Sequence, residues 1–176
     1  MTDWRLLVVM AHPDDETFRC GGTPALLARR GVTIQVLTAT RGEAATSDLS
    51  SPDERDRLAL AREQELQCAC AALGIRPPLL LNYPDGKLNT VAEEEAAGRV
   101  LAVMEEFGPH VVITWPPDGM SGHPDHVAVN RWANLAFRRA LTGNLKRYLA
   151  ALYYVTVACS VADALGYTHL HATPDE

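Results

Sequence analysis

Two short blocks of the sequence carry a high density of side chains that bind metals. The first, His12-Pro-Asp-Asp-Glu16, places one histidine and three carboxylates within five positions, directly after the apolar run Leu6–Ala11. The second, Gly122-His-Pro-Asp-His126, repeats the His-Pro-Asp unit and ends in another histidine. Burying so much charge at the end of a core strand is costly without a compensating partner. The two blocks therefore indicate a bound cation.

The spacing inside each block favours one shared ion. His12 lies three positions before Asp15, and His123 lies three positions before His126. Residues three apart share one side of a helical turn, and proline suits the first turn of a helix. The two side chains of each pair can therefore bind the same ion. Nitrogen and oxygen ligands without thiolates suit Zn²⁺, and Mn²⁺, Fe²⁺ or Co²⁺ are also chemically compatible.

The number of ligand-type side chains suggests that the ion takes part in a reaction. A catalytic zinc site usually has three protein ligands and an open position for water, whereas four ligand-type side chains are present. One of them is free for another role, and a charged histidine beside the ion could act as an acid or stabilise an oxyanion. Asp14 belongs to neither ligand pair. A carboxylate that does not bind the ion but lies beside an activated water is the expected general base.

Alternating strands and helices are predicted to position the two blocks. Apolar runs rich in β-branched residues predict strands over residues 6–10, 32–40, 79–82, 110–115 and 149–159. Caps and helical patterns predict helices over 23–30, 52–73, 90–107 and 124–141. This alternation predicts an α/β fold with a parallel sheet and helices on both faces. Ligands bind beyond the carboxyl ends of such strands, where both blocks begin.

The composition argues against some classes of binding partner and some cellular locations. The chain has 176 residues and a net charge of −6 at pH 7, which argues against nucleic acid or an anionic membrane as the main partner. No apolar run approaches the roughly 18–20 residues that span a bilayer, and the N-terminus lacks a signal-peptide pattern. We therefore expect a cytoplasmic protein. The four cysteines show no CxxC spacing and are expected to be reduced.

The paired blocks also carry a resemblance to a known family. The segment 11-AHPDDE-16 followed by Gly21-Gly22, together with Gly122–His126, resembles the LmbE-like or PIG-L family of zinc-dependent N-acetylglucosaminyl deacetylases. Members that make mycothiol and bacillithiol precursors belong to this family. Supporting features are 41-RGE-43, 62-REQEL-66 and 83-YPDG-86, and the resemblance spans residues 5 to about 155.

The resemblance implies a fold, an activity and a set of roles. The fold is a Rossmann-like three-layer α/β sandwich (the LmbE-like fold), and residues 1–176 are expected to form one domain of it. The activity is metal-dependent removal of an acetyl group from an N-acetylated small molecule, an N-acetylglucosamine derivative. The matching residues are His12, Asp15 and His126 as metal ligands, Asp14 as general base, His123 as acid or oxyanion stabiliser, Asp125 as the carboxylate that orients His123, and Arg62 and Glu43 as contacts to sugar hydroxyls.

The sequence departs from the family pattern at three places. Ser121 stands where some members carry a tyrosine that holds the carbonyl oxygen, and Phe18-Arg19-Cys20 replaces residues that are often small. The chain also stops at Glu176, before the usual further strands and helix, so it is either a short variant or lacks a tail. A neighbouring subunit could then complete the pocket. A hydrolase of another amide or ester, and a non-catalytic metal- or ligand-binding module, remain alternatives.

Overall fold

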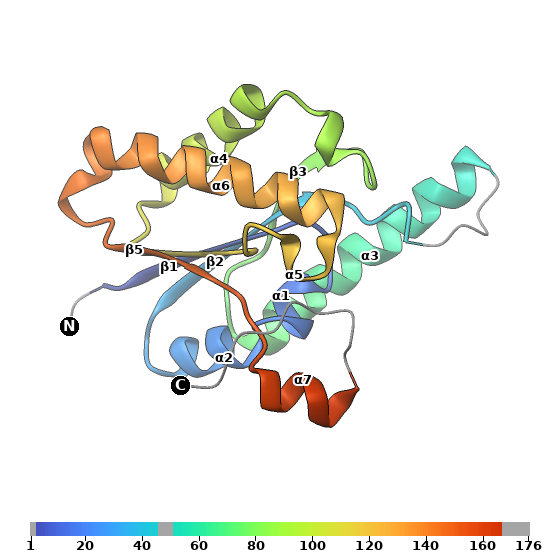
Figure 1. Ribbon diagram of the computed structural model, residues 1–176, viewed down its shortest axis with the longest axis horizontal. Helices are drawn as coiled ribbons and strands as arrows, with labels where there is room; N and C mark the ends of the chain where they lie inside the picture. The colour runs from blue at the N-terminus through green and yellow to red at the C-terminus, as the bar shows by residue number, and fades with distance from the viewer. Residues whose placement is uncertain (1–2, 46–50, 167–176) are drawn as a thin grey trace.

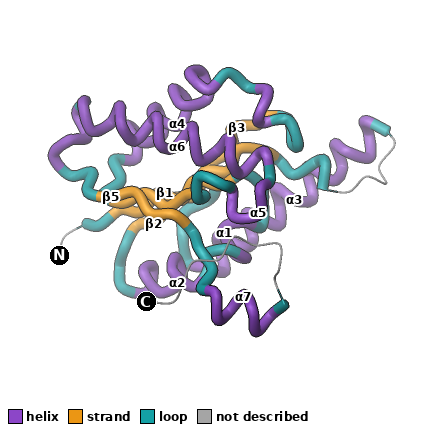
Figure 2. The backbone as a smooth tube through the Cα atoms, viewed as in Figure 1, coloured by secondary structure: helices purple, strands orange, loops and turns teal. Residues whose placement is uncertain are grey.

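In the part of the chain that the structure describes, a five-stranded parallel sheet forms the centre. The computed structural model describes residues 3–45 and 51–166. The strands are β1 (Arg5–Met10), β2 (Thr33–Thr40), β3 (Leu79–Tyr83), β4 (Val111–Thr114) and β5 (Ala151–Tyr154). Their order across the sheet is β3-β2-β1-β4-β5, and every neighbouring pair is parallel. Figure 2 shows the sheet as one layer between helices.

Helices cover both faces of this sheet. The helices α4 (Glu93–Phe107) and α6 (Pro124–Thr142) lie on one face, whereas α1 (Asp15–Phe18), α2 (Gly22–Arg29) and α3 (Pro52–Leu73) lie on the other (Figure 1). Shorter elements complete the described chain: η1 (Leu88–Thr90), α5 (Gly119–Gly122), η2 (Asn144–Arg147) and α7 (Cys159–Leu165). This three-layer α/β arrangement confirms the predicted fold class.

Local sequence signals explain where the main elements lie. In β1, Leu7 and Val8 are fully buried, as expected for a central strand covered on both faces. The helix α3 begins at a capping box. The Ser51 hydroxyl accepts a hydrogen bond from the Glu54 backbone N–H, and the Glu54 carboxylate accepts one from the Ser51 backbone N–H. It ends at Gly74, whose φ of 73° is the left-handed conformation that glycine adopts without strain. The bounds of this helix match the prediction.

The strand order fixes the place of the functional site. Successive strands run from β1 outward to β2 and β3, and the chain then crosses back to β4 and β5 on the other side of β1. The carboxyl ends of β1 and β4 therefore flank the point where the direction of the sheet reverses, which is where ligands bind in open parallel sheets. His12 follows β1, and the segment that contains α5 and the start of α6 follows β4.

Three element predictions differ clearly from the structure, whereas the other predicted bounds lie within one residue of the observed ones. The sequence predicts a last strand over 149–159, but β5 comprises only the four residues that pair with β4. The helix α4 begins at Glu93 rather than at residue 90, because residues 88–90 form a 3-10 turn. The short helices α5 and α7 are not predicted, and α1 corresponds only to the helical turn expected after His12, since four to seven residues are too few for a periodic pattern. Among residues 3–45 and 51–166, no helix is both long and apolar enough to cross a membrane.

Candidate metal centre

His12 lies in the turn after β1, and Asp15 is the first residue of α1. The predicted helical turn does not start at Pro13, because Asp14 has a φ of 99° and α1 begins only at Asp15. This conformation folds the Asp15 carboxylate back over the end of β1. Its Oδ2 accepts the His12 backbone N–H at 2.9 Å and lies 3.6 Å from the His12 Nδ1. Asp15 is 4% exposed, so this carboxylate is directed into the site rather than into solvent.

His126 reaches the same point from the first turn of α6. Its ring stacks on the indole of Trp115, with centroids 3.6 Å apart and planes 7° from parallel. Its Nδ1 donates to the carbonyl of Gly119 at 3.1 Å, which leaves Nε2 facing Asp15 Oδ1 at 3.9 Å. Burial lowers the pKa of His126 to about 4, so the ring is neutral at pH 7 and its Nε2 carries a free lone pair.

The three predicted ligands therefore lie together. One ligand atom from each of His12, Asp15 and His126 falls within 4.8 Å of the other two. Two nitrogens and a carboxylate at such spacing form a donor set that zinc and similar divalent ions accept. The Nδ1 of His126 already donates to a carbonyl, and the outer nitrogen of His12 faces carboxylates. Metal-binding histidines are commonly oriented in this way. The residues thus fit a divalent ion.

Three carboxylates surround the His12 ring. Its Nε2 lies 3.1 Å from Asp85 Oδ1 and 3.2 Å from Asp125 Oδ2, while Asp15 faces its Nδ1. Burial alone would lower the pKa of His12, but hydrogen bonds with Asp125, Asp15 and Asp85 outweigh it and raise that pKa to about 11. The raised pKa reflects a strongly negative local potential. The same potential favours a divalent cation.

Asp125 is fully buried and acts on His12 rather than on His123 through its carboxylate. Its Oδ2 accepts the Gly86 amide at 2.8 Å, and its Oδ1 accepts the Leu88 amide at 3.0 Å. Burial would raise the pKa of Asp125, yet the hydrogen bonds from His12 and these two amides hold it below its usual value. The link between Asp125 and His123 runs through the backbone, since the Asp125 amide donates to His123 Nδ1 at 3.2 Å.

His123 caps α6, and this role orients its ring. Nδ1 accepts a backbone N–H, so in the neutral ring the proton sits on Nε2. His123 is exposed, and its ring lies 4.6 Å from that of His126 and 5.1 Å from that of His12. The His123 ring therefore lies beside two of the candidate ligands. His123 can therefore donate a hydrogen bond to a substrate oxygen.

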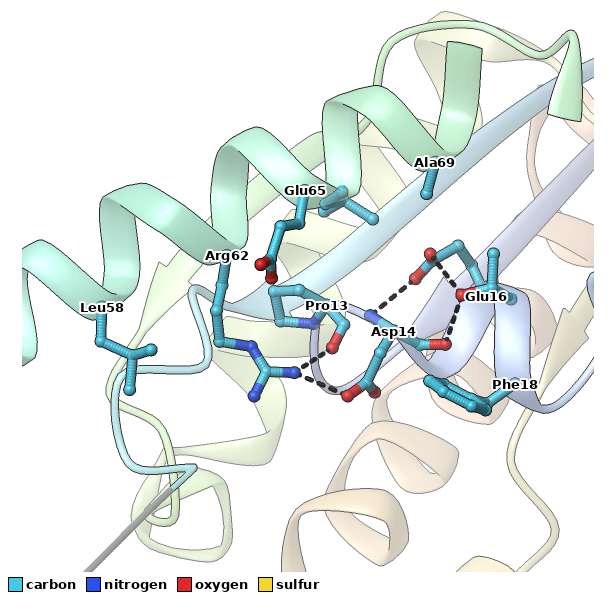
Figure 3. A pocket seen from close by; sticks show the side chains of 10 residues that line it. Pro13, Asp14, Glu16, Phe18, Leu58, Arg62, Glu65 and Ala69 are labelled. Atoms are coloured by element: carbon cyan, nitrogen blue, oxygen red, sulfur yellow. Dashed lines mark hydrogen bonds and ion pairs between the residues drawn. The ribbon is translucent and has the colours of Figure 1, made fainter. Parts of the chain in front are cut away.

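Asp14 and Arg62 form an ion pair at the edge of the site. The Nη2 of Arg62 donates to Asp14 Oδ2 at 2.7 Å and also contacts the Pro13 carbonyl (Figure 3). Burial and the charge of Asp15 raise the pKa of Asp14, although Arg62 opposes the shift. Gly42 gives the guanidinium its room, because a Cβ there would lie 2.6 Å from Arg62 Nε.

Asp85 is a site residue that sequence reasoning does not assign. Its backbone N–H donates a hydrogen bond to Glu43 Oε1, and its Oδ2 accepts one from the Ala44 backbone N–H, both at 2.8 Å. These two hydrogen bonds join the two loops. Glu43, predicted to contact sugar hydroxyls, thus holds the loop that carries Asp85. A signal for Asp85 exists in the sequence, because 83-YPDG-86 follows the carboxyl end of β3 at the same edge of the sheet as the two His-Pro-Asp blocks.

Backbone strain is concentrated around this site. Among the described residues, three non-glycine residues have positive φ: Asp14 at 99°, Asn82 at 58° and Met120 at 66°. They lie in the segments that follow β1, end β3 and follow β4, and each precedes a site residue. Such conformations cost about 1–3 kcal/mol each and persist where the surroundings demand them. The strain is consistent with selection for function at this edge of the sheet.

A comparison with protein families identifies the chain's relatives. The model of the family PIG-L, described as GlcNAc-PI de-N-acetylase, matches residues 7–137. The chain belongs to the PIG-L family. The match contains all three candidate ligands and both His-Pro-Asp blocks, and it confirms the resemblance drawn from those blocks.

Relatives of this PIG-L chain include named deacetylases. A 1D-myo-inositol 2-acetamido-2-deoxy-alpha-D-glucopyranoside deacetylase from Mycobacterium sp. (strain KMS) is 41% identical over 157 residues, covering 77% of this chain and 51% of that protein. The chain thus spans about half the length of the curated relatives that it matches.

Solved structures support the same fold. The N,N'-diacetylchitobiose deacetylase from Pyrococcus horikoshii aligns with a TM-score of 0.71 and 25% identity, over 81% of this chain and 52% of that chain. The conserved protein TT1542 from Thermus thermophilus aligns with a TM-score of 0.65 and 30% identity, over 88% of this chain and 66% of that chain. These similarities confirm the LmbE-like fold predicted for this PIG-L member.

Proposed function

We propose that this protein is a zinc-dependent N-deacetylase that hydrolyses the acetamide of an N-acetylated amino sugar. The convergence of His12, Asp15 and His126 within 4.8 Å at the reversal point of the sheet is the observation that supports this most directly. The names of the relatives add the substrate class, because the mycobacterial relative and the Pyrococcus structure are both named as deacetylases of acetamido sugars.

His12, Asp15 and His126 would hold the ion, and three protein ligands leave room for water and substrate. When bound, a divalent ion supplies Lewis acidity, which polarises a carbonyl and acidifies water. We propose Zn²⁺ because the donor set lacks thiolates and matches catalytic zinc sites, with Mn²⁺, Fe²⁺ and Co²⁺ as alternatives. Asp85 and Asp125 would keep the His12 ring in the ligating orientation.

The remaining residues would move the protons. Asp14 accepts a proton from water as the oxygen adds to the acetyl carbon, and the N–H at His123 Nε2 donates to the carbonyl oxygen as negative charge develops there. Asp14 then returns the proton to the nitrogen as the C–N bond breaks. The products are acetate and the free amine. Arg62 would hold Asp14 in place between these two transfers.

The experiment is a hydrolysis assay on the purified chain after removal of metal and reloading with Zn²⁺. The panel contains the glycosides of N-acetylglucosamine, N,N'-diacetylchitobiose, acetylated diamines and simple acetyl esters. We expect acetate release from the amino sugars, loss of activity with a chelator, and no activity in His126→Ala. Release only from the diamines or the esters would favour the other hydrolase, and no release from any substrate despite stoichiometric zinc would favour a non-catalytic metal-binding module.

A further inference from the structure

A cavity of about 360 Å³ opens beside Asp14, on the side of the turn that faces α3. This volume lies within the range of about 300–1,000 Å³ that small-molecule pockets occupy. The lining comes from the turn between β1 and α1, from α1 itself and from the middle of α3 (Figure 3). The lining includes Asp14 but none of the candidate ligands His12, Asp15 and His126, so the cavity lies beside the candidate metal centre, within reach of a substituent next to an amide held at Asp14.

Three polar side chains of the cavity, Asp14, Glu16 and Arg62, form hydrogen bonds within its lining, whereas Glu65 also lines it and is exposed. Arg62 donates to Asp14 and to the carbonyl of Pro13. The buried Glu16 carboxylate accepts the Asp14 amide and the Thr17 hydroxyl, each at 3.0 Å. These groups are thus committed to holding the turn, and a ligand gains little by competing for them.

Apart from the exposed Glu65, the surface that remains for a ligand is apolar. Phe18 at the end of α1 is 81% exposed, although a phenyl ring gains from burial. Across the cavity, Leu58 and Ala69 of α3 are half-buried, and Leu66 closes the floor at 1% exposed. Figure 3 shows the Asp14 carboxylate between the Arg62 guanidinium and the Phe18 ring. An exposed aromatic ring beside a reacting group is a place where an apolar ligand face can bind.

From this cavity we propose that Phe18, Leu58 and Ala69 form a specificity subsite for an apolar-faced substituent next to the scissile amide. The proposal rests on the proposed deacetylase function and adds a substrate class to it: an amino sugar whose substituent presents a flat or aliphatic surface. That surface could belong to the aglycone or to a longer acyl chain.

The test compares three glucosamine derivatives on the zinc-loaded wild type: methyl N-acetylglucosaminide, the phenyl glycoside of the same sugar, and the methyl glycoside carrying an N-butanoyl group. We expect kcat/KM for one of the two larger compounds to exceed that for the methyl acetyl compound about 10-fold or more, chiefly through KM. A gain with the phenyl glycoside would assign the subsite to the aglycone, and a gain with the butanoyl compound would assign it to the acyl chain.

Alanine variants inside the cavity, and one on α3 outside it, provide a matched comparison. Leu58→Ala and Phe18→Ala should each remove most of the preference, whereas Leu60→Ala should keep it, because Leu60 is 60% exposed on α3 and does not line the cavity. Equal kcat/KM for all three compounds, or an unchanged preference in both cavity variants, would overturn the subsite while leaving the deacetylase intact.

Equilibrium binding separates this failure from failure of the proposed function. If none of the compounds is hydrolysed, calorimetric titration of the zinc-loaded protein with the same compounds still decides the subsite. Tighter binding of a larger compound, lost in Phe18→Ala and retained in Leu60→Ala, would support it. Equal affinity for all compounds, or no binding of any of them, would refute it.

Discussion

The His12 Nε2 lies between two carboxylates from distant parts of the chain, 3.1 Å from Asp85 and 3.2 Å from Asp125. Asp125 is fixed by the amides of Gly86 and Leu88, and Asp85 by the amide of Ala44. The ring orientation is therefore set by backbone groups before any ion binds. Preorganisation of this kind lowers the cost of forming a metal site.

Replacing Asp85 with alanine should weaken metal binding. The variant removes one acceptor from His12 and leaves the Ala44 amide without its partner, so we expect the zinc dissociation constant to rise about 10–100-fold. Competition with a chromogenic chelator measures this constant directly. Asp163→Ala, an exposed position on α7, is the control. Unchanged zinc affinity in Asp85→Ala would show that Asp125 alone is sufficient to orient the His12 ring.

Gly119 should be irreplaceable because of its closeness to His126. Its φ is +69°, and a Cβ there would lie 3.0 Å from the His126 Cβ and 3.1 Å from Val127 Cγ2. Gly119→Ala should destabilise the fold by at least about 1–2 kcal/mol, the cost of left-handed alanine, and should lower zinc affinity by displacing the carbonyl that holds His126. Chemical denaturation and zinc titration measure the two effects.

Gly98→Ala is the matched control for that variant. Gly98 lies in the interior of α4, and a Cβ added there would meet nothing within 4 Å and would need no positive φ. Alanine there should stabilise the protein by about 0.5–1 kcal/mol, because glycine loses more backbone entropy in a helix. A similar loss of stability in both variants would contradict the assignment of Gly119 as a spatial requirement of the metal centre.

The pattern of apolar residues, together with the residues that begin and end helices, is sufficient to predict the layers of the fold. The bounds of α3 follow from Ser51, Pro52 and Gly74, and the strand after residue 5 follows from an unbroken apolar run. These signals are local, and the parallel sheet follows from their alternation. The convergence of His12 with His126 needs one further general rule, that ligands gather at the carboxyl edge of the sheet.

The orientation of individual site residues is beyond the sequence. The family resemblance pairs Asp125 with His123, but the fold brings the Gly86 and Leu88 amides to Asp125, and its carboxylate faces His12. Asp85 joins the site only because β3 and β1 end at the same edge. Such contacts depend on loop conformations, including the positive φ of Asp14, that leave no periodic signal.

Glu16 should matter as a hydrogen-bond acceptor rather than as a charge. Its buried carboxylate accepts the Asp14 amide and so supports the strained turn. Glu16→Gln keeps an acceptor oxygen and should retain most of the activity, whereas Glu16→Met leaves the amide unsatisfied and should cost about 1–3 kcal/mol of unfolding free energy. Denaturation and kcat measured side by side check this. Equal loss of activity in both variants would point to the charge instead.

The two cysteines in the last turns of α3 should differ sharply in reactivity. Cys68 is exposed, whereas Cys70 is buried, and burial followed by the nearby charge of Glu16 raises the pKa of the Cys70 thiol to about 12. Because the thiolate is the reactive form, Cys70 should resist alkylation of the native protein at pH 7–9 and react on unfolding. Mass spectrometry of iodoacetamide-treated protein, with Cys68 as the internal reference, shows which site is modified.

Asp14→Asn should separate catalysis from metal binding. Asn keeps the size of the side chain but cannot accept a proton, so kcat for amide hydrolysis should fall about 10²–10⁴-fold, the usual contribution of a general base. Zinc stoichiometry should stay at that of the wild type, because Asp14 is outside the candidate ligand set. Metal analysis and steady-state kinetics on one preparation give both values, with Asp163→Asn as the control. Wild-type turnover in Asp14→Asn would transfer the base role to another group, and loss of zinc would instead place Asp14 among the ligands.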